Sequence, residues 1–255
     1  MNLLFVGDVV GKDSCEFLAQ KLYKIKREYD IDITVVNGEN SASGNGITKA
    51  SLDMLVAAGA DIVTTGNHCF KRREFVDMYD SCDYLCRPCN YPEGVIGRGV
   101  AYFDAGRFSV AVVNLQGVVY MQPLDNPFNA IDKVLSEIDT PNIIVDFHAE
   151  ATAEKKAMAY YLDGRVTALL GTHTHVQTAD EIILPQKTAY ITDVGMTGAE
   201  HSVLGVDTAL AIEKQKMQYP VRFVESKEPC MINAVVVSFD EKTGKSYKIV
   251  RINEK

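Results

Sequence analysis

Two histidines lie two residues apart in "LLGTHTHVQT", residues 169–178, directly after an apolar run. The chain has only five histidines and no tryptophan, so the pairing of His173 with His175 is informative. Because both follow Gly171 at the end of the apolar run, we expect a loop at a strand end, not two positions within a strand. Imidazole is a common metal ligand. Two imidazoles converging from such a loop indicate a metal site.

Other apolar runs also end in residue types that can bind a metal ion or transfer a proton. Their endings supply Asp8 in "LLFVGD", Glu39 and Asn40 in "ITVVNGEN", Asn67 and His68 in "IVTTGNH", and His148 in "IIVDFHAE". Each has an ordinary structural alternative: a helix cap for Asp8 or Asn67, a turn at residues 39–40, or a hydrogen-bonded core position for His148. Taken together, these alternatives would have to coincide at five strand ends, which favours one shared site.

The spacing of apolar residues predicts the elements that position this site. The runs alternate with segments of helical spacing, such as Phe17, Leu18, Leu22 and Ile25, or Leu52, Leu55 and Val56. Such alternation predicts βαβ units around sheets buried on both faces. Near the C-terminus, "NAVVVSFD" and "SYKIVRI" flank "EKTG" and predict an antiparallel hairpin. The fold class is therefore α/β with mixed sheets, whose ligands bind beyond the carboxyl ends of the strands.

Composition and length indicate the number of domains and the kind of partner. The 255 residues carry a net charge of -8 and are 47% hydrophobic, ample for one domain spanning residues 1–255. Prolines and glycines at 86–99 predict a small lid or cap-like excursion within about 70–105. The acidic balance argues against a broad nucleic-acid or membrane surface and favours a small-molecule partner. The start lacks a basic signal region and no run is long enough to span a bilayer, so we expect a cytoplasmic protein.

Three of the six cysteines cluster in "CDYLCRPC", at Cys82, Cys86 and Cys89. A zinc or iron–sulfur site is one alternative, but a clear fourth ligand is missing. We expect reduced thiols packed as small apolar groups, and the sequence predicts no further role for them.

The strand-end residues, in this order, resemble the calcineurin-like metallophosphoesterase superfamily. Its pattern runs Asp-x-His, Gly-Asp, Gly-Asn-His, His and Gly-His-x-His. Two motifs depart from it: the first is "DVV" from Asp8, without a histidine, and the second is "GEN", with Glu39 in place of aspartate. Both variants look like the YmdB-like branch of bacterial phosphodiesterases. The resemblance implies a sandwich of two mixed β-sheets flanked by helices, and it is compatible with a homo-oligomer.

The resemblance also implies two divalent or trivalent transition-metal ions. It assigns one ion to Asp8, Glu39, Asn40 and His175, and the other to Glu39, Asn67, His148 and His173. Glu39 would be shared, and Asn40 would replace the missing histidine. Mixed nitrogen and oxygen ligation suits Fe or Mn, with Zn as a further option. Two such ions, about 3.5 to 4 Å apart, activate a bridging hydroxide for attack on phosphorus. His68, next to Asn67, is the predicted proton donor to the leaving group.

The predicted function is hydrolysis of phosphodiesters, by resemblance 2′,3′-cyclic or 3′,5′-cyclic nucleotides. A phosphomonoesterase or nucleotidase using the same metals is the enzymatic alternative. A non-enzymatic scaffold that keeps the fold is another alternative, but a retired site has no chemical reason to keep its whole ligand set. The stretch "SASGNGIT", residues 41–48, predicts a turn before a helix capped by Thr48, with phosphate contact as the alternative.

Overall fold

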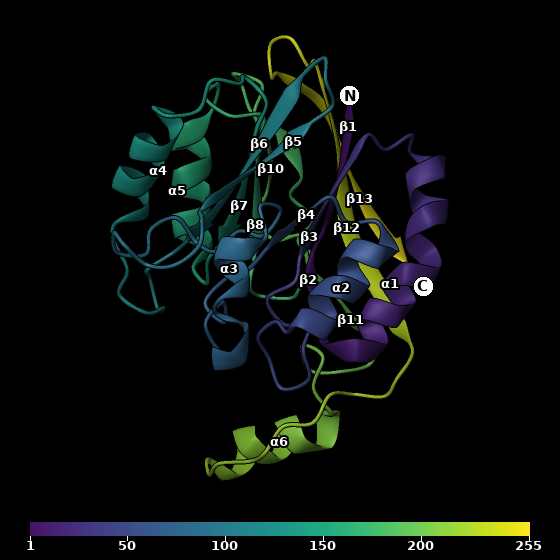
Figure 1. Ribbon diagram of the computed structural model, residues 1–255. Helices are drawn as coiled ribbons and strands as arrows, with labels where there is room; N and C mark the ends of the chain where they lie inside the picture. Colours follow the sequence, from purple (N-terminus) through teal and green to yellow (C-terminus); the bar gives the residue numbers. More distant parts are fainter.

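The computed structural model describes all 255 residues. Two β-sheets stack face to face, with helices on both outer faces (Figure 1). The first sheet has seven strands in the order β2 (Asp8–Val9), β11 (Met196–Ala199), β12 (Cys230–Phe239), β1 (Asn2–Val6), β3 (Ile33–Asn37) and β4 (Ile62–Thr64), with β13 (Ser246–Glu254) paired to β12. The second sheet has six: β5 (Val100–Asp104), β6 (Ser109–Gln116), β7 (Ile143–His148), β8 (Ala168–Thr172), β10 (Ala189–Ile191) and β9 (Ile182–Ile183). This is the predicted sandwich.

Both sheets are mixed. Strands β1, β3 and β4 run parallel to one another, as do β6, β7, β8 and β10. Strand β12 is antiparallel to β1 and to β13, so the predicted C-terminal hairpin is confirmed. Because the parallel strands of each sheet share a direction, their carboxyl ends gather at one edge of each sheet.

Helices cover the outer faces and divide the core into three layers. Helices α1 (Gly11–Glu28) and α2 (Lys49–Ala58) pack on the first sheet, and α4 (Pro127–Leu135) and α5 (Thr152–Leu162) pack on the second (Figure 1). The layer between the sheets includes Phe5 and Val35 from one sheet and Val112 and Leu170 from the other. No helix is both long enough and apolar enough to pass through a membrane.

The predicted helical faces are confirmed with one exception. Leu18, Leu22 and Ile25 of α1 are buried, as is Leu52 of α2. Val56 is instead exposed, because it lies outside the face that α2 turns toward the sheet. Thr48 caps α2 as predicted: its side chain accepts a hydrogen bond from the Ser51 backbone N–H at 3.3 Å, within a capping box.

Residues 70–105, the predicted lid or cap-like excursion, pack as part of the sandwich. They contain η1 (Arg73–Phe75), the short helix α3 (Met78–Ser81) and strand β5. Phe75 and Tyr79 are buried in the core layer between the first sheet and helices α1 and α2. Val63 forms a parallel bridge with Leu85. The segment therefore supplies core residues, and its closing over the site stays a prediction.

The cysteines do not form a metal site. All six are free, and Cys82 and Cys86 are buried while Cys89 is partly buried. Cys86 belongs to the layer between the sheets. Burial raises the pKa of Cys89 to about 12, which keeps it a thiol. The only cluster of three ligand side chains contains no cysteine, so these thiols pack as apolar groups.

An arm formed by residues 200–229 projects from the sandwich and carries α6 (Thr208–Met217) (Figure 1). Only Ala211 of this helix is buried. The base of the arm returns to the site through Leu204, described below.

Candidate metal centre

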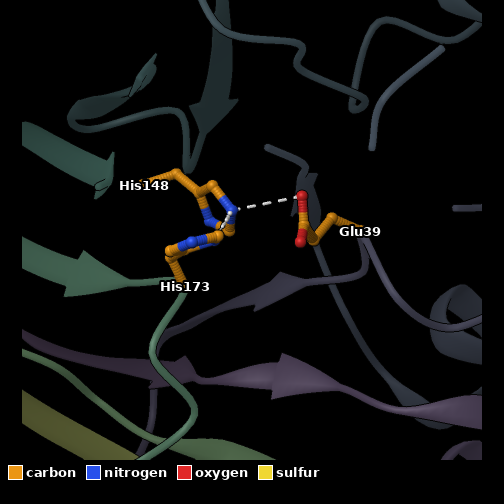
Figure 2. Close-up of side chains that lie close together, drawn as sticks. All are labelled: Glu39, His148 and His173. Atoms are coloured by element: carbon orange, nitrogen blue, oxygen red, sulfur yellow. Dashed lines mark hydrogen bonds and ion pairs between the residues drawn. The ribbon is translucent and has the colours of Figure 1, made fainter. Parts of the chain in front are cut away.

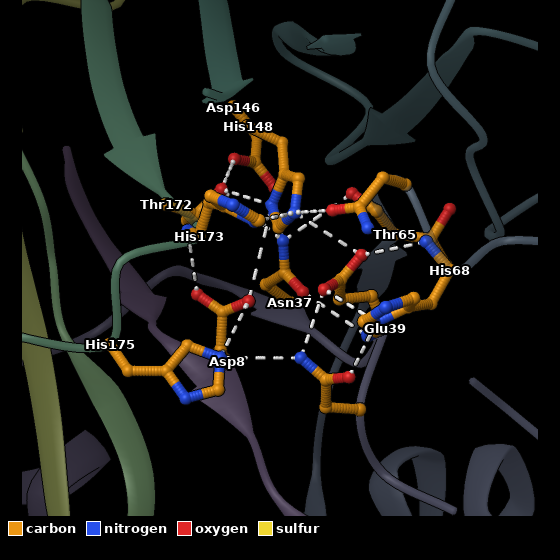
Figure 3. Close-up of polar contacts among 12 residues, drawn as sticks. Asp8, Asn37, Glu39, Thr65, His68, Asp146, His148, Thr172, His173 and His175 are labelled. Carbon is orange, nitrogen blue, oxygen red and sulfur yellow. Dashed lines mark hydrogen bonds and ion pairs between the residues drawn. The ribbon is translucent and has the colours of Figure 1, made fainter. Parts of the chain in front are cut away.

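All eight predicted site residues meet between the carboxyl edges of the two sheets. Figure 3 labels Asp8, Glu39, His68, His148, His173 and His175 among them. Asp8 lies in β2, and His148 is the last residue of β7. The others follow strand ends: Glu39 and Asn40 after β3, Asn67 and His68 after β4, and His173 and His175 after β8. The two sheets therefore each supply part of one cluster, as the strand-end pattern predicted.

Three side chains converge on the buried His148 ring, and together with it they form what we name the His148 group: Glu39, Asn67, His148 and His173. The Nε2 atom of His148 lies 3.2 Å from Glu39 Oε2, 3.0 Å from Asn67 Oδ1 and 3.1 Å from His173 Nδ1. Ligand atoms of Glu39, His148 and His173 all lie within 4.8 Å of one another (Figure 2). Three potential ligand atoms thus lie within 3.2 Å of the His148 Nε2 atom.

Three further side chains, Asp8, Asn40 and His175, form what we name the His175 group. His175 Nε2 lies 3.8 Å from Asp8 Oδ1 and 3.3 Å from Asn40 Nδ2. The same Asn40 nitrogen donates to Glu39 Oε1 at 2.9 Å. Since Glu39 Oε2 faces His148, its carboxylate stands between the two groups. The amide oxygen of Asn40 faces away, toward His68, and a 180° rotation of the amide exchanges the two atoms.

The residues fit a cation. Asp8 is fully buried, yet its Oδ1 atom has no hydrogen-bond partner. A buried carboxylate oxygen without a partner is costly, and burial accordingly raises the pKa of Asp8. A metal ion between Asp8 and His175 would remove that cost. Mixed imidazole, amide and carboxylate donors are the set that transition metals such as Fe, Mn and Zn accept.

A buried hydrogen-bond chain fixes the His148 ring. Its Nδ1 lies 2.9 Å from the Thr172 hydroxyl, which donates to Asp146 Oδ1 at 2.7 Å. Because that hydroxyl gives its proton to Asp146, it accepts from His148 Nδ1–H, so Nε2 is the nitrogen that faces the cluster and would bind a metal after losing its proton. Burial raises the pKa of Asp146 to about 6, and Asn37 donates to its other oxygen at 2.9 Å. Asp146 went unrecognised in the sequence, although it lies two residues before His148 on the same strand face.

Charges within the His148 group shift its pKa values in opposite directions. Burial lowers the pKa of His148, but the carboxylates of Glu39 and Asp8 outweigh it and raise that pKa to about 9. Burial raises the pKa of Glu39, but His148 and His68 outweigh it and hold that pKa well below its ordinary value. Burial and the neighbouring His148 lower the pKa of His173 to about 3. His173 is therefore neutral and able to donate a lone pair.

His68 stands at the rim of the cluster. Its side chain is 25% exposed, whereas that of His148 is fully buried. The Nδ1 atom lies 2.9 Å from Asn40 Oδ1 and 3.3 Å from Glu39 Oε1. Its backbone N–H donates to Glu39 Oε2 at 3.1 Å. With Nδ1 engaged by these oxygens, Nε2 is the free nitrogen of the ring.

Of the structural alternatives, the helix caps do not hold, whereas the other two are present beside any ligand role. Residues 39–40 form a turn closed by a hydrogen bond from the Ser41 N–H to the Gly38 carbonyl at 3.0 Å, and His148 is buried and hydrogen-bonded. Helix α1 has Val10 at its N-cap with no side-chain hydrogen bond, so Asp8 caps nothing there. The Asn67 side chain contacts His148. Residues 41–46 form the expected turn, closed by a hydrogen bond from Ala42 N–H to the Gly46 carbonyl. The Gly44 N–H donates to the Glu225 carboxylate at 3.0 Å, which argues against the phosphate alternative.

Two mixed sheets with a histidine, amide and carboxylate cluster at their carboxyl edges define a hydrolase of the metallophosphoesterase type. A family model described as YmdB-like protein matches residues 4–252. The chain therefore belongs to the YmdB-like family.

Similar proteins agree over nearly the whole length. The chain is 45% identical to a 2′,3′-cyclic-nucleotide 2′-phosphodiesterase of Bacillus subtilis, over 99% of this chain and 96% of that protein. A solved structure of a hypothetical protein from Thermus thermophilus superposes with a TM-score of 0.93 at 38% identity, covering 99% of this chain and 98% of that one. A phosphatase from Mycoplasma pneumoniae superposes with a TM-score of 0.92 at 34% identity, covering 100% and 94%.

Proposed function

We propose that this chain is a dinuclear metal-dependent phosphodiesterase whose substrates are cyclic nucleotides, 2′,3′-cyclic before 3′,5′-cyclic. The observation that carries this proposal is the position of Glu39, with one carboxylate oxygen toward His148 and the other toward Asn40. A carboxylate shared in this way suits two neighbouring cations. The substrate class is supported by the Bacillus subtilis relative, which is a 2′,3′-cyclic-nucleotide 2′-phosphodiesterase.

The two ligand groups would each hold one ion. Asp8, Asn40 and His175 would hold the first, Asn67, His148 and His173 the second, and Glu39 would contact both. Fe or Mn suits these ligands best, with Zn next. When bound, such ions supply positive charge for phosphate oxygens and lower the pKa of coordinated water.

His68 would move the proton that the leaving group requires. Its ring borders the cluster at the solvent-facing rim, and its Nδ1 is engaged by Asn40 Oδ1. The Nε2 atom is then the one that donates to the departing ribose oxygen, as imidazole can near neutral pH. Asn40 orients this ring as well as belonging to the His175 group.

A phosphomonoesterase is the second candidate, because the Mycoplasma pneumoniae structure of the same fold is a phosphatase. Turnover of bis-p-nitrophenyl phosphate against p-nitrophenyl phosphate separates the two. We expect the diester to be preferred by at least about tenfold in kcat/KM, a difference of about 1.4 kcal/mol in transition-state stabilisation. Preference for the monoester would contradict the proposal. Full metal content without turnover of either substrate would favour a scaffold.

The substrate is tested by product analysis on nucleoside 2′,3′-cyclic phosphates. Hydrolysis of the bond between phosphorus and O2′ adds one water, returns a proton to O2′ and leaves a 3′-phosphate. We expect this product to predominate over the 2′-phosphate. Faster turnover of 3′,5′-cyclic nucleotides would replace the substrate assignment and leave the phosphodiesterase assignment intact. A homo-oligomer stays a prediction.

A further inference from the structure

A lysine and an aspartate form a fully buried ion pair beside the candidate metal centre. Lys155 Nζ lies 2.8 Å from Asp193 Oδ2, and neither side chain is exposed to solvent. Lysine is seldom fully buried unless it is paired. Because removing both charges from water is expensive, such a pair is weak support for a role in stability alone. Its neighbours indicate another role.

The pair holds the chain on both sides of His173. Asp193 Oδ2 accepts hydrogen bonds from the Thr174 backbone N–H at 3.0 Å and from the Thr174 hydroxyl at 2.8 Å. Lys155 Nζ donates to the carbonyl oxygen of Thr172 at 2.8 Å. The other oxygen of Asp193 accepts from the Gly195 N–H at 2.8 Å. The ion pair thus fixes the residues before and after His173 to the sandwich interior.

The turn at residues 173–175 needs contacts from the surrounding structure to keep its backbone conformation. His173 has a φ of 100° and His175 a φ of 66°, a region that residues with side chains seldom occupy. Such conformations persist only where the surroundings impose them. Thr174, between the two histidines, makes both of its polar contacts with Asp193. Without that carboxylate, the turn would relax toward ordinary backbone angles and carry both imidazoles with it.

We propose that Lys155, Asp193 and Thr174 are positioning residues that hold His173 and His175 in their metal-binding geometry. Because this turn supplies one imidazole to each ligand group, loosening it should weaken both ions together. This inference rests on the proposed function, since it takes both histidines as metal ligands.

Titration of the metal-free protein with Mn²⁺, followed by calorimetry, tests the inference without relying on activity. The double variant Lys155→Met/Asp193→Asn removes both charges, so neither is left buried alone. Thr174→Val removes only the hydroxyl, and Thr174→Ser restores it. We expect about 10- to 100-fold weaker Mn²⁺ binding at both sites in the double variant, the usual range for residues that orient ligands. Thr174→Val should lose about tenfold and Thr174→Ser less than about threefold, within the same range.

A control removes a partly exposed ion pair outside the cluster. Arg251 Nε lies 2.7 Å from Glu181 Oε2, and Arg251→Met/Glu181→Gln should leave Mn²⁺ binding unchanged even if it lowers stability. If the double variant fails to fold, the two Thr174 variants decide. Parent-like Mn²⁺ affinity in a folded double variant or in Thr174→Val overturns the inference, as does an equal loss in Thr174→Ser. A parent protein that binds no Mn²⁺ instead overturns the proposed function.

Discussion

The two ligand groups of the site differ in what holds them in place. In the His148 group, three potential ligand atoms lie within 3.2 Å of one buried imidazole nitrogen, and the ring is fixed through Thr172 to Asp146. In the His175 group, the corresponding separations are 3.8 and 3.3 Å. The other ring nitrogen of His175 donates to the carbonyl oxygen of Leu204, at the base of the projecting arm. Each group has one residue in a strand, His148 in β7 or Asp8 in β2, so the difference lies in how closely the ligand atoms approach and in what fixes the imidazole.

Because of this difference, we expect the two ions to bind with different affinities. The His148 group needs no rotation of a side-chain amide, and His148 has only to release its proton. The His175 group requires the Asn40 amide to rotate, since its nitrogen and not its oxygen now faces His175. Ligands that are already in place bind with a smaller entropic cost. We therefore expect the His148 group to hold its ion more tightly.

His68 contacts both groups and should belong to neither. We expect His68→Ala to keep about two ions per chain and to lose about 10²- to 10⁴-fold in turnover, the usual range for a general acid. The loss should shrink for diesters of p-nitrophenol, because that leaving group needs little protonation. Metal content measured beside turnover on an activated and an ordinary diester checks this. An equal loss on both substrates would remove the acid role, and loss of metal would make His68 a ligand.

Replacing one histidine of each group should separate the two ions. We expect His175→Ala to leave one tightly bound ion and His173→Ala to weaken the tighter one by more than about 10²-fold, because a lost ligand costs at least as much as a lost orienting residue. Competition with a chelator of known affinity measures both sites. In the parent protein it should resolve two affinities. A single affinity for both ions in the parent protein, or the same metal binding in the two variants, would contradict the expected difference between the two ligand groups.

Asn40→Ala should affect only the weaker ion. The neutral amide is a poorer donor than imidazole for a transition metal, so we expect a loss of about tenfold at that site. Asn40→Asp, which offers a carboxylate of the same size, should restore or tighten binding. Asn67→Ala is the matched control and should weaken the tighter ion instead. Unchanged metal binding with lower turnover would mean that Asn40 only orients His68, and unchanged metal binding and turnover would contradict both roles.

The smallest expected effect is the change with pH in the free energy of unfolding of the metal-free protein. The pKa of His148 is raised to about 9 in the folded chain from 6.5, so the folded state keeps a proton that the unfolded state releases. That stabilisation is fully present below pH 6.5 and is lost as the pH rises through 9. The free energy of unfolding in chelator should fall by no more than about 1.4 kcal/mol per pH unit in this window. Urea unfolding of the parent and of His148→Gln checks it: equal slopes would contradict the assignment.

The sequence was sufficient to predict the fold class and the gathering of the eight residues. Each of the five apolar runs described above is followed by polar residues, and these runs became β1, β3, β4, β7 and β8. Parallel strands bring such endings together by geometry, without detailed knowledge of packing. The roles of the eight residues stay predictions.

Other features could not be predicted because they depend on long-range packing. Strand β6 pairs with β7 but ends at Gln116, without a histidine or carboxylate to mark it. Lys155 resembles any surface lysine of an amphipathic helix. Its burial arises only because folding brings Asp193, 38 residues later in the chain, against it. The orientation of the His175 ring likewise depends on where the arm places the carbonyl oxygen of Leu204, which accepts a hydrogen bond from His175 Nδ1.

The number of metal ions bound per folded chain decides whether the centre is dinuclear. Purified protein, reconstituted with Mn or Fe and freed of excess ion, should contain about two ions per chain by elemental analysis, because Glu39 stands between two ligand groups. Milder chelation should leave about one, held by the His148 group. Less than about half an ion per chain after reconstitution would contradict the dinuclear centre and the phosphodiesterase chemistry that depends on it.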